Sequence, residues 1–169
     1  MLYLFRKDKE YKKIVKDILR NVEFKKISNI EHHCISRMEH SVKISYYSYR
    51  IAKKLGMDYV SVARGGLLHD FFLDGDERNY KRRFLDTFTH PKKALNTSIE
   101  HFNINSIEKN IIVSHMFPFY ISFPKYKESL LVNLVDKVIG SLEMLRGFGC
   151  KFKYQFNYTY VFMLLLITR

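Results

Sequence analysis

The sequence predicts an all-α fold, and three observations support this prediction. Apolar residues recur at helical spacing in nearly every segment, whereas alternation with period two is confined to KFKYQFNYTY at residues 151–160. Only three prolines and seven glycines interrupt the chain. An apolar content of 47% over 169 residues is typical of a folded chain with a real core, so we expect one domain over residues 1–169.

The first half of the chain predicts three helices. Apolar side chains fall on one face over residues 9–24, which indicates an N-terminal helix. Residues 36–55 repeat the pattern, and Gly56 provides a stop signal. The segment DYVSVARGGLLHDFF, residues 58–72, is interpreted as a helix with Asp58 as its N-cap.

The second half begins with a charged segment, DGDERNYKRR at residues 74–83, which we interpret as a loop. A helix is expected to follow, with Thr89 as its N-cap and Pro91 in its first turn. Residues 105–117 form another predicted helix, and residues 125–145 a longer amphipathic one. The aromatic and basic tail, residues 147–169, is interpreted as a last core helix, an interfacial anchor or a short hairpin.

Charge and cysteine content restrict the setting in which the protein works. A net charge of +12 favours an anionic partner, namely nucleic acid, an acidic membrane surface or a phosphorylated small molecule; a merely solvated basic surface is the alternative. Two cysteines, Cys34 and Cys150, are too few for a disulfide framework, so we expect a reducing, cytoplasmic location. The longest apolar run, VFMLLLI, is shorter than a transmembrane helix requires, and no transmembrane segment is expected.

Histidine and aspartate recur near helix ends or in apolar sequence, which is costly unless they are hydrogen-bonded, paired or metal-bound. Each of them alone is also explained as a helix cap or a satisfied core contact. Helices packed around one centre could direct all of them inward, and imidazole and carboxylate together suit a first-row transition metal. The candidates are His40, His69, Asp70, His90, His115 and Asp136.

The order of His40, the pair His69-Asp70 and Asp136 resembles the H…HD…D signature of the HD-domain metal-dependent phosphohydrolase superfamily. The context RMEHSVKISYYSYRIAKKLGMDYVSVARGGLLHD is similar to the first two motif helices of that family, and the likeness extends over about residues 36–146. The resemblance implies a helical bundle in which these four residues bind one metal ion. In members with two ions, two further histidines lie before the last aspartate. His90 and His115 match that interval, with Asp70 as the bridging ligand.

The resemblance also implies an activity and a cofactor. It predicts hydrolysis of a phosphoester or phosphoanhydride in a nucleotide or related phosphorylated metabolite, through a hydroxide activated by one or two divalent ions. His69 and Asp70 would form the catalytic centre. Iron or manganese are the expected ions, and zinc, nickel and cobalt are also compatible. Basic residues near these ligands are candidates for holding substrate phosphates: Arg82, Arg83, Lys92, Lys93 and Lys137.

Departures from the family pattern leave the substrate open. Many two-metal relatives carry a lysine three residues after the aspartate, where this chain has Leu73, and the GYP motif of the cyclic-di-GMP branch is absent. Members that hydrolyse diadenosine tetraphosphate are closer in size and helix order. His32 and His33 are expected at the rim of the site at most, and His101 is expected to face solvent.

Two other functions fit the sequence. Some HD-like folds use the same ligand set in an oxygen-using di-iron enzyme. A non-catalytic module that binds nucleic acid or another anion would use the basic surface, but no zinc-finger, helix-turn-helix or RNP signature supports it, and no stable nucleic-acid complex is expected. A homodimer is compatible with all three functions.

Overall fold

The structure is a computed structural model that describes residues 5, 7–32, 35–73 and 80–145, with only the backbone described at residues 31–32 and 80–88. Helices make up nearly all the regular structure of these residues, which confirms the predicted all-α class. Strands β1 (Glu31–His32) and β2 (Ile35–Ser36) pair antiparallel. The predictions for the tail, residues 147–169, fall outside this range.

The predicted N-terminal helix is divided into short pieces: α2 (Lys9–Ile14), α3 (Lys16–Arg20), α4 (Val22–Lys26) and the 3₁₀ turn η1 (Ile27–Asn29). Asn21 is in an extended conformation, and its side chain caps α4 by accepting from the backbone N–H of Phe24. Tyr11, Val15 and Ile18 are fully buried, as the pattern indicated, whereas Val22 is exposed. The helical spacing therefore predicted the buried face correctly as far as Ile18, but the chain changes direction at Asn21 and Val22 no longer lies on that face.

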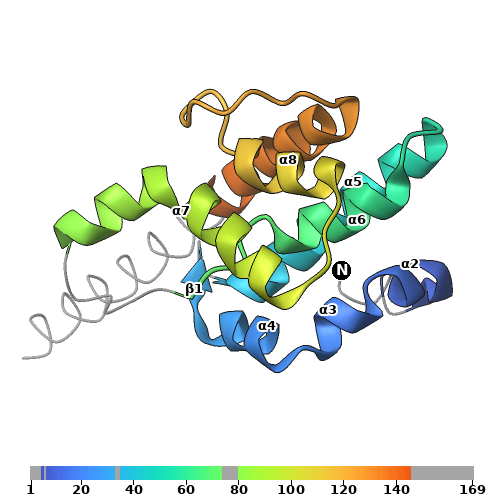
Figure 1. Cartoon of the computed structure of the whole chain (residues 1–169), viewed down its shortest axis with the longest axis horizontal. Coiled ribbons are helices and arrows are strands. Elements are labelled where there is room, and N and C mark those ends of the chain that lie inside the picture. The colour runs from blue at the N-terminus through green and yellow to red at the C-terminus, as the bar shows by residue number, and fades with distance from the viewer. Residues whose placement is uncertain (1–4, 6, 33–34, 74–79, 146–169) are drawn as a thin grey trace, which may run out of the picture.

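Helices α5 (Arg37–Lys54) and α6 (Tyr59–Leu68) form the antiparallel hairpin at the centre of the fold (Figure 1). Ser36 caps α5, and Gly56 follows its end with φ +63°, a left-handed conformation that favours glycine. Asp58 caps α6 by accepting from the backbone N–H of Ser61 at 3.0 Å. The predicted stop at Gly56 and the predicted N-cap Asp58 are therefore confirmed, whereas the helix predicted over residues 58–72 ends at Leu68.

Two glycines of α6 let neighbouring helices approach closely. A Cβ atom at Gly66 would lie 3.1 Å from the Cα of Ser45 on α5, and one at Gly65 would lie 2.8 Å from the Cδ1 of Ile111. The contact at Gly66 is reinforced by Ser45, whose hydroxyl accepts from Tyr11 Oη at 2.7 Å and donates to the Ala63 carbonyl at 2.6 Å. The glycine pair thus sets the spacing of the central helices.

Helix α7 (Tyr80–His101) begins well before the predicted N-cap, so Thr89 and Pro91 lie inside it. Arg82 and Arg83 therefore belong to a helix, and the prediction that they lie in a loop was wrong. Propensity pointed to a helix start near Pro91 because proline lacks the backbone N–H that a helix interior uses. The structure accommodates this loss within a helix of 22 residues.

Helix α8 (Ser106–Ser114) begins with a capping box between Asn105 and Glu108 and runs parallel to α6. The two helices are joined at their starts, where Asn105 Nδ2 donates to Ser61 Oγ at 2.8 Å, and near their ends, where the rings of His69 and His115 lie 4.9 Å apart. A further helix, at the end of the described residues, spans residues 127–145. It follows the same direction, because the Glu128 carboxylate accepts from the backbone N–H of Asp58 at the start of α6.

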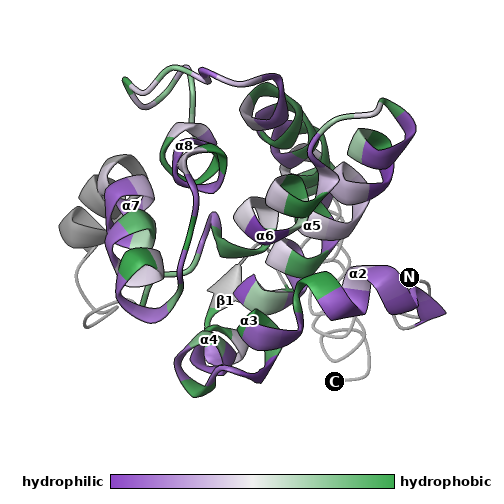
Figure 2. Cartoon of the chain, turned by 45° about the vertical axis from the view of Figure 1, so that its right-hand side comes forward, coloured by the Kyte–Doolittle hydropathy of each residue, from purple (hydrophilic) through white to green (hydrophobic). Residues whose placement is uncertain are grey.

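The apolar core lies between the hairpin and its neighbours. One cluster joins the N-terminal helices to α5 and α6, and a second joins α5, α6 and α8 to the helix of residues 127–145. Figure 2 shows mostly hydrophilic positions along α2 at the surface and mixed positions along α5 and α6. No helix within the described ranges has both the length and the apolar character that crossing a membrane requires.

Gly65→Ala is expected to lower the free energy of unfolding by roughly 1–3 kcal/mol, because the new methyl group would press on Ile111 in a packed core. Gly140→Ala is the matched control. A Cβ atom there meets nothing within 4 Å, so the better helix propensity of alanine should stabilise the fold by up to ~1 kcal/mol. Urea denaturation measures both variants, and equal stability changes would contradict the close-approach role of Gly65.

Candidate metal centre

The six predicted histidines and aspartates meet at one end of the parallel helices. His40 comes from the first turn of α5, His69 is the C-cap of α6, and Asp70 follows it directly. Helix α7 contributes His90, the C-cap of α8 is His115, and the helix of residues 127–145 contributes Asp136. Five helices therefore supply a side chain, from within the helix or just after its end, to the same place.

Two groups of candidate ligand atoms share His69. In the first, Asp136 Oδ1 lies 3.2 Å from His40 Nε2 and 3.8 Å from His69 Nε2. The second consists of His69, Asp70 and His115, and in it Asp70 Oδ1 lies 3.5 Å from His115 Nε2. His90 Nε2 lies 3.5 Å from the same oxygen. The other oxygen of Asp70, Oδ2, lies 3.6 Å from His69 Nε2. The Asp70 carboxylate therefore stands between the two groups.

These spacings fit a shared ion. Two ligands at about 2.1 Å from one first-row metal ion lie roughly 3.0–3.4 Å apart in octahedral or tetrahedral geometry. The separation of His90 Nε2 and His115 Nε2 is 3.0 Å, which falls within that range. The 3.2 Å between Asp136 Oδ1 and His40 Nε2 also falls within it, and the 3.5 Å from Asp70 Oδ1 to the Nε2 atoms of His90 and His115 lies just beyond it.

The outer nitrogen of two histidines is held by a backbone carbonyl, so the inner nitrogen faces the centre. His69 Nδ1 donates to the Gly66 carbonyl at 2.8 Å, and His115 Nδ1 donates to the Ile112 carbonyl at 2.7 Å. Because a carbonyl oxygen only accepts, each of these rings in its neutral form carries its proton on Nδ1 and leaves a lone pair on Nε2. Fixing Nδ1 in this way is typical of metal-ligating histidines.

Both helices α6 and α8 end at the centre, and this favours positive charge there. Their last carbonyl groups lack partners within the helix and carry the negative end of the helix dipole. His69 and His115 occupy these C-caps in the same αR conformation. Two helix C-termini directed at one point attract a cation and disfavour a bound anion in direct contact.

Within the described part of the chain, two atoms of the centre are buried without a hydrogen-bond partner: His69 Nε2 and Asp70 Oδ1. His69 is 0% exposed and Asp70 is 5% exposed, so bulk water does not satisfy these atoms. An unpaired buried acceptor costs about 1–3 kcal/mol, and more when it is charged. Two such acceptors on adjacent residues of one centre are what a metal-binding donor set looks like without its ion.

Electrostatics keep the carboxylates ionised and His69 neutral. Burial lowers the pKa of His69 to about 4, which disfavours its imidazolium form at neutral pH. Burial alone would raise the pKa of Asp70 and Asp136, but neighbouring histidines outweigh it and hold both pKa values below the ordinary value. Burial also opposes charging of His40, yet its hydrogen bonds with Asp136 and Glu143 raise its pKa to about 10.

The helix of residues 127–145 contributes more than Asp136. Glu143 is 5% exposed, and its Oε2 accepts from His40 Nδ1 at 2.7 Å while its Oε1 accepts from Lys43 at 3.1 Å. Asn133 Nδ2 donates to the carbonyls of His115 at 2.6 Å and Phe117 at 2.8 Å. Neither Glu143 nor Asn133 was predicted from the sequence. Their spacing from Asp136, seven and three positions, places them on the same helix face and is the signal that could have identified them.

His90 is held by an aromatic ring. The Phe72 ring stacks on it with centroids 5.4 Å apart, and the guanidinium of Arg37 lies 3.9 Å from the centre of the same ring. Arg37 also donates to the Phe72 carbonyl at 2.8 Å. His90 and Asp136 have 12% side-chain exposure each, so solvent reaches the cluster at these two residues.

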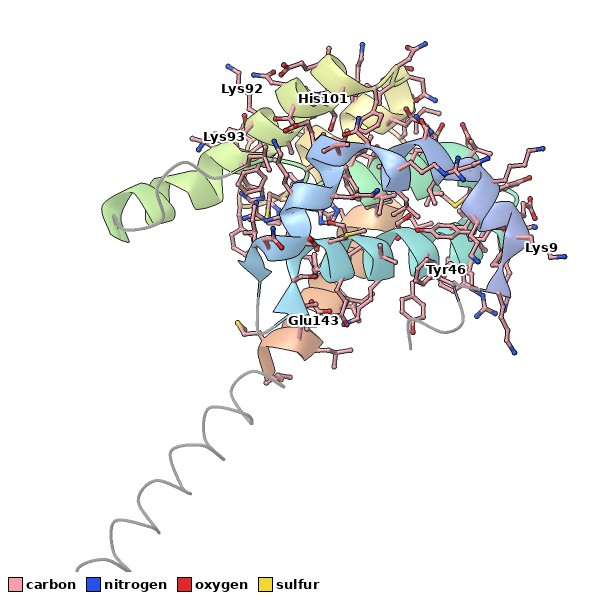
Figure 3. All side chains as sticks on the ribbon, turned by 90° about the horizontal axis from the view of Figure 1, so that it is seen from below. Lys9, Tyr46, Lys92, Lys93, His101 and Glu143 are labelled. Atoms are coloured by element: carbon pink, nitrogen blue, oxygen red, sulfur yellow. The ribbon has the colours of Figure 1, made fainter. Side chains whose placement is uncertain are left out.

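The candidate phosphate-binding residues divide into three cases. Lys137 is at the centre, where its Nζ donates to the His115 carbonyl at 2.8 Å and lies 3.4 Å from Asp136 Oδ2. Lys92 and Lys93 project from the exposed side of α7 (Figure 3). The side chains of Arg82 and Arg83 lie outside the described part of the chain.

Of the remaining histidines, His101 contradicts its prediction. It is only partly exposed, and its ring packs on Phe71 with centroids 5.8 Å apart, instead of facing solvent. The side chains of His32 and His33 are outside the described set. His101 therefore belongs to the core edge behind the centre.

No family model, no curated protein and no solved structure matches this chain. Its function is therefore inferred from the geometry and chemistry of the centre.

Asn133→Ala is expected to lower the free energy of unfolding by about 1–3 kcal/mol, because the carbonyls of His115 and Phe117 lose a buried donor. Asn103→Ala, at an exposed position, serves as the control and should change stability by less than ~0.5 kcal/mol. Thermal and urea unfolding of both variants provide the measurement. A loss at Asn133 no larger than at Asn103 would argue against this anchoring of His115.

Proposed function

We propose that this chain is a metal-dependent phosphohydrolase whose centre has the ligand arrangement of the HD-domain superfamily. The observation that carries the proposal is the pair of buried acceptors without hydrogen-bond partners, His69 Nε2 and Asp70 Oδ1, inside a cluster of imidazole and carboxylate groups. Structural histidines in a core satisfy both ring nitrogens, whereas here the inner nitrogen of His69 is left without a partner.

The cluster has donors for two ions. His40, His69 and Asp136 would hold the first, with one oxygen of Asp70. His90 and His115 would hold the second, with the other oxygen of Asp70. Nitrogen and oxygen donors of this kind suit iron or manganese, and also zinc, cobalt or nickel.

Divalent ions bound here would lower the pKa of a coordinated water toward neutrality and neutralise charge on a phosphoryl group. The residues of the chain have distinct tasks in this reaction. Asp70 and Asp136 stay ionised and so contribute −2 against the +4 of two ions, which leaves the centre positive toward an anionic substrate. Glu143 orients His40, while Asn133 and Lys137 hold the backbone of His115.

The substrate we propose is a phosphoester or phosphoanhydride of a nucleotide or of a related small phosphorylated metabolite. The net charge of +12 would steer such an anion toward the protein, and solvent reaches the cluster at His90 and Asp136. Lys137 is the described cation nearest to the ligands, but its ammonium is already engaged by the His115 carbonyl. We propose that the protein acts in the cytoplasm, in line with its two cysteines.

Purified protein is expected to contain about two first-row metal ions per chain by elemental analysis, since the cluster offers donors for two sites. His115→Ala should retain about one ion, because it removes a ligand of the second site alone. Asp70→Ala should lose metal and phosphoesterase activity together, because Asp70 serves both sites. His101→Gln is the matched control and should keep both.

Other metal contents and activities would each have a distinct meaning. Full metal content in Asp70→Ala would exclude the bridging role. Metal-loaded protein without activity on phosphomonoesters, cyclic nucleotides and dinucleoside polyphosphates, but coloured and oxygen-sensitive, would favour the di-iron oxygen-using alternative. Protein that takes up no metal and binds nucleic acid with a steep salt dependence would contradict the proposal and support the binding module.

Glu143→Gln is expected to weaken metal affinity about 10- to 100-fold while leaving the fold intact, because the carboxylate that orients His40 and increases its basicity is replaced by a neutral amide of the same shape. Competition with a chromophoric chelator measures the affinity, and circular dichroism checks the fold. Glu100→Gln, at an exposed position of α7, is the control. Unchanged affinity in Glu143→Gln would show that the charge of Glu143 does not tune the site.

A further inference from the structure

From Ser129 onward, the helix of residues 127–145 turns its charged residues inward and exposes a row of large apolar side chains, whereas an ordinary surface helix directs its charged residues to solvent. Between Ser129 and Leu145 it carries three charged residues, Asp136, Lys137 and Glu143, with side-chain exposures of 12%, 31% and 5%. All three contact the metal centre or its histidines. The outer side of the helix therefore has no charge between Ser129 and Leu145.

Large apolar side chains occupy that outer side in a regular row. Leu130, Leu134, Val138 and Leu142 follow one another at intervals of four, and Leu145 extends the row by a turn. They are exposed by 48%, 55%, 61%, 51% and 64% respectively. We call these five residues the leucine ridge. Isolated exposed leucines are ordinary, but a continuous ridge of this kind marks an interaction site.

The spacing of the ridge is suited to packing against an identical ridge. Rows of side chains at i±4 interdigitate in the commonest class of helix–helix packing in globular proteins. If a two-fold axis passes beside Val138, Leu134 of one copy faces Leu142 of the other, and Leu130 lies near Leu145. A two-fold contact needs such a self-complementary row, because each copy contributes the same surface.

Charge favours a second copy over a partner recruited by electrostatics. A chain with net charge +12 repels another copy over most of its surface, so a homodimer needs a contact free of like charges. The ridge meets this need. A strongly acidic partner would instead be drawn to the exposed lysines of the N-terminal helices, away from an uncharged row.

The ridge supplies half or more of the area of a standard interface. Burying five half-exposed side chains of this size would remove roughly 400–500 Å² per copy, against ~800 Å² per partner in a standard interface. Met144, 46% exposed, lies beside the ridge and adds to this area. A polar rim around the ridge would have to supply the remainder.

We propose that the leucine ridge is the interface of a homodimer in which the helices of residues 127–145 of two copies pack against each other around a two-fold axis. This inference is independent of the enzymatic proposal. It gives the outer side of the helix a partner while the inner side serves the metal centre.

The test measures molecular mass against concentration for the full chain by analytical ultracentrifugation. Wild type should dimerise reversibly, and Leu134→Glu and Leu142→Glu should each weaken the dimer about 100-fold or more, because a glutamate would be buried in an apolar contact. Ile99→Glu is the matched control, since Ile99 is 50% exposed on α7 away from the ridge, and it should leave the dimer unchanged. Circular dichroism of each variant separates a weaker dimer from a failure to fold.

A cross-linking variant tests the two-fold axis directly. In a chain with Cys34 and Cys150 replaced by serine, Val138→Cys should form a disulfide-linked dimer on mild oxidation, whereas Ile99→Cys should not. A monomer at every attainable concentration would overturn the proposal, including one in which residues 147–169 cover the ridge. Dimers that persist in both glutamate variants, or monomers that bind lipid vesicles through the ridge, would overturn it as well.

Discussion

The fold depends on keeping a buried polar centre satisfied. His69 and Asp70 are almost fully removed from water, and such groups destabilise a protein by several kcal/mol unless they have partners. Only part of this requirement is met inside the chain, through hydrogen bonds to the outer nitrogens of the histidines. The atoms that face inward are those that the proposed ions would bind. The same need accounts for why α6 and α8 run parallel and stop together: their C-caps place two imidazoles at one point and add the negative ends of two helix dipoles.

The need to satisfy this buried centre also determines which side chains the helix of residues 127–145 turns inward. To reach the centre it must turn Asn133, Asp136 and Glu143 inward, and only a part of its apolar surface then remains available for the core, through residues such as Val132. The other large apolar side chains of this helix therefore face solvent. The exposed apolar surface is thus a consequence of the three tasks of this helix. It supplies the candidate ligand Asp136, it supplies Glu143, which orients His40, and it supplies Asn133, which anchors the end of α8.

Features that depend on neighbouring residues could be predicted from the sequence, whereas features that depend on contacts between distant residues could not. Helices α5 and α6 were predicted, with the stop at Gly56 and the N-cap Asp58, because these two residues act on their immediate neighbours. The six candidate ligands followed from a motif resemblance, and the structure brings them together. The start of α7 was not predictable, because local rules place Pro91 in a first turn while the structure keeps it inside a longer helix. Glu143 was missed because a glutamate in an amphipathic pattern is normally solvated, and its burial depends on His40, far away in sequence.

The two halves of the centre are oriented in different ways. His40, His69 and Asp136 belong to elements packed along the central hairpin, and the two histidines are oriented by Glu143 and by a backbone carbonyl. In the other half, the Ile112 carbonyl fixes His115. His90 stacks on the Phe72 ring, and its Nε2 lies 3.0 Å from His115 Nε2. An ion held in the first group would in turn hold Asp70, which is the ligand that the second group needs.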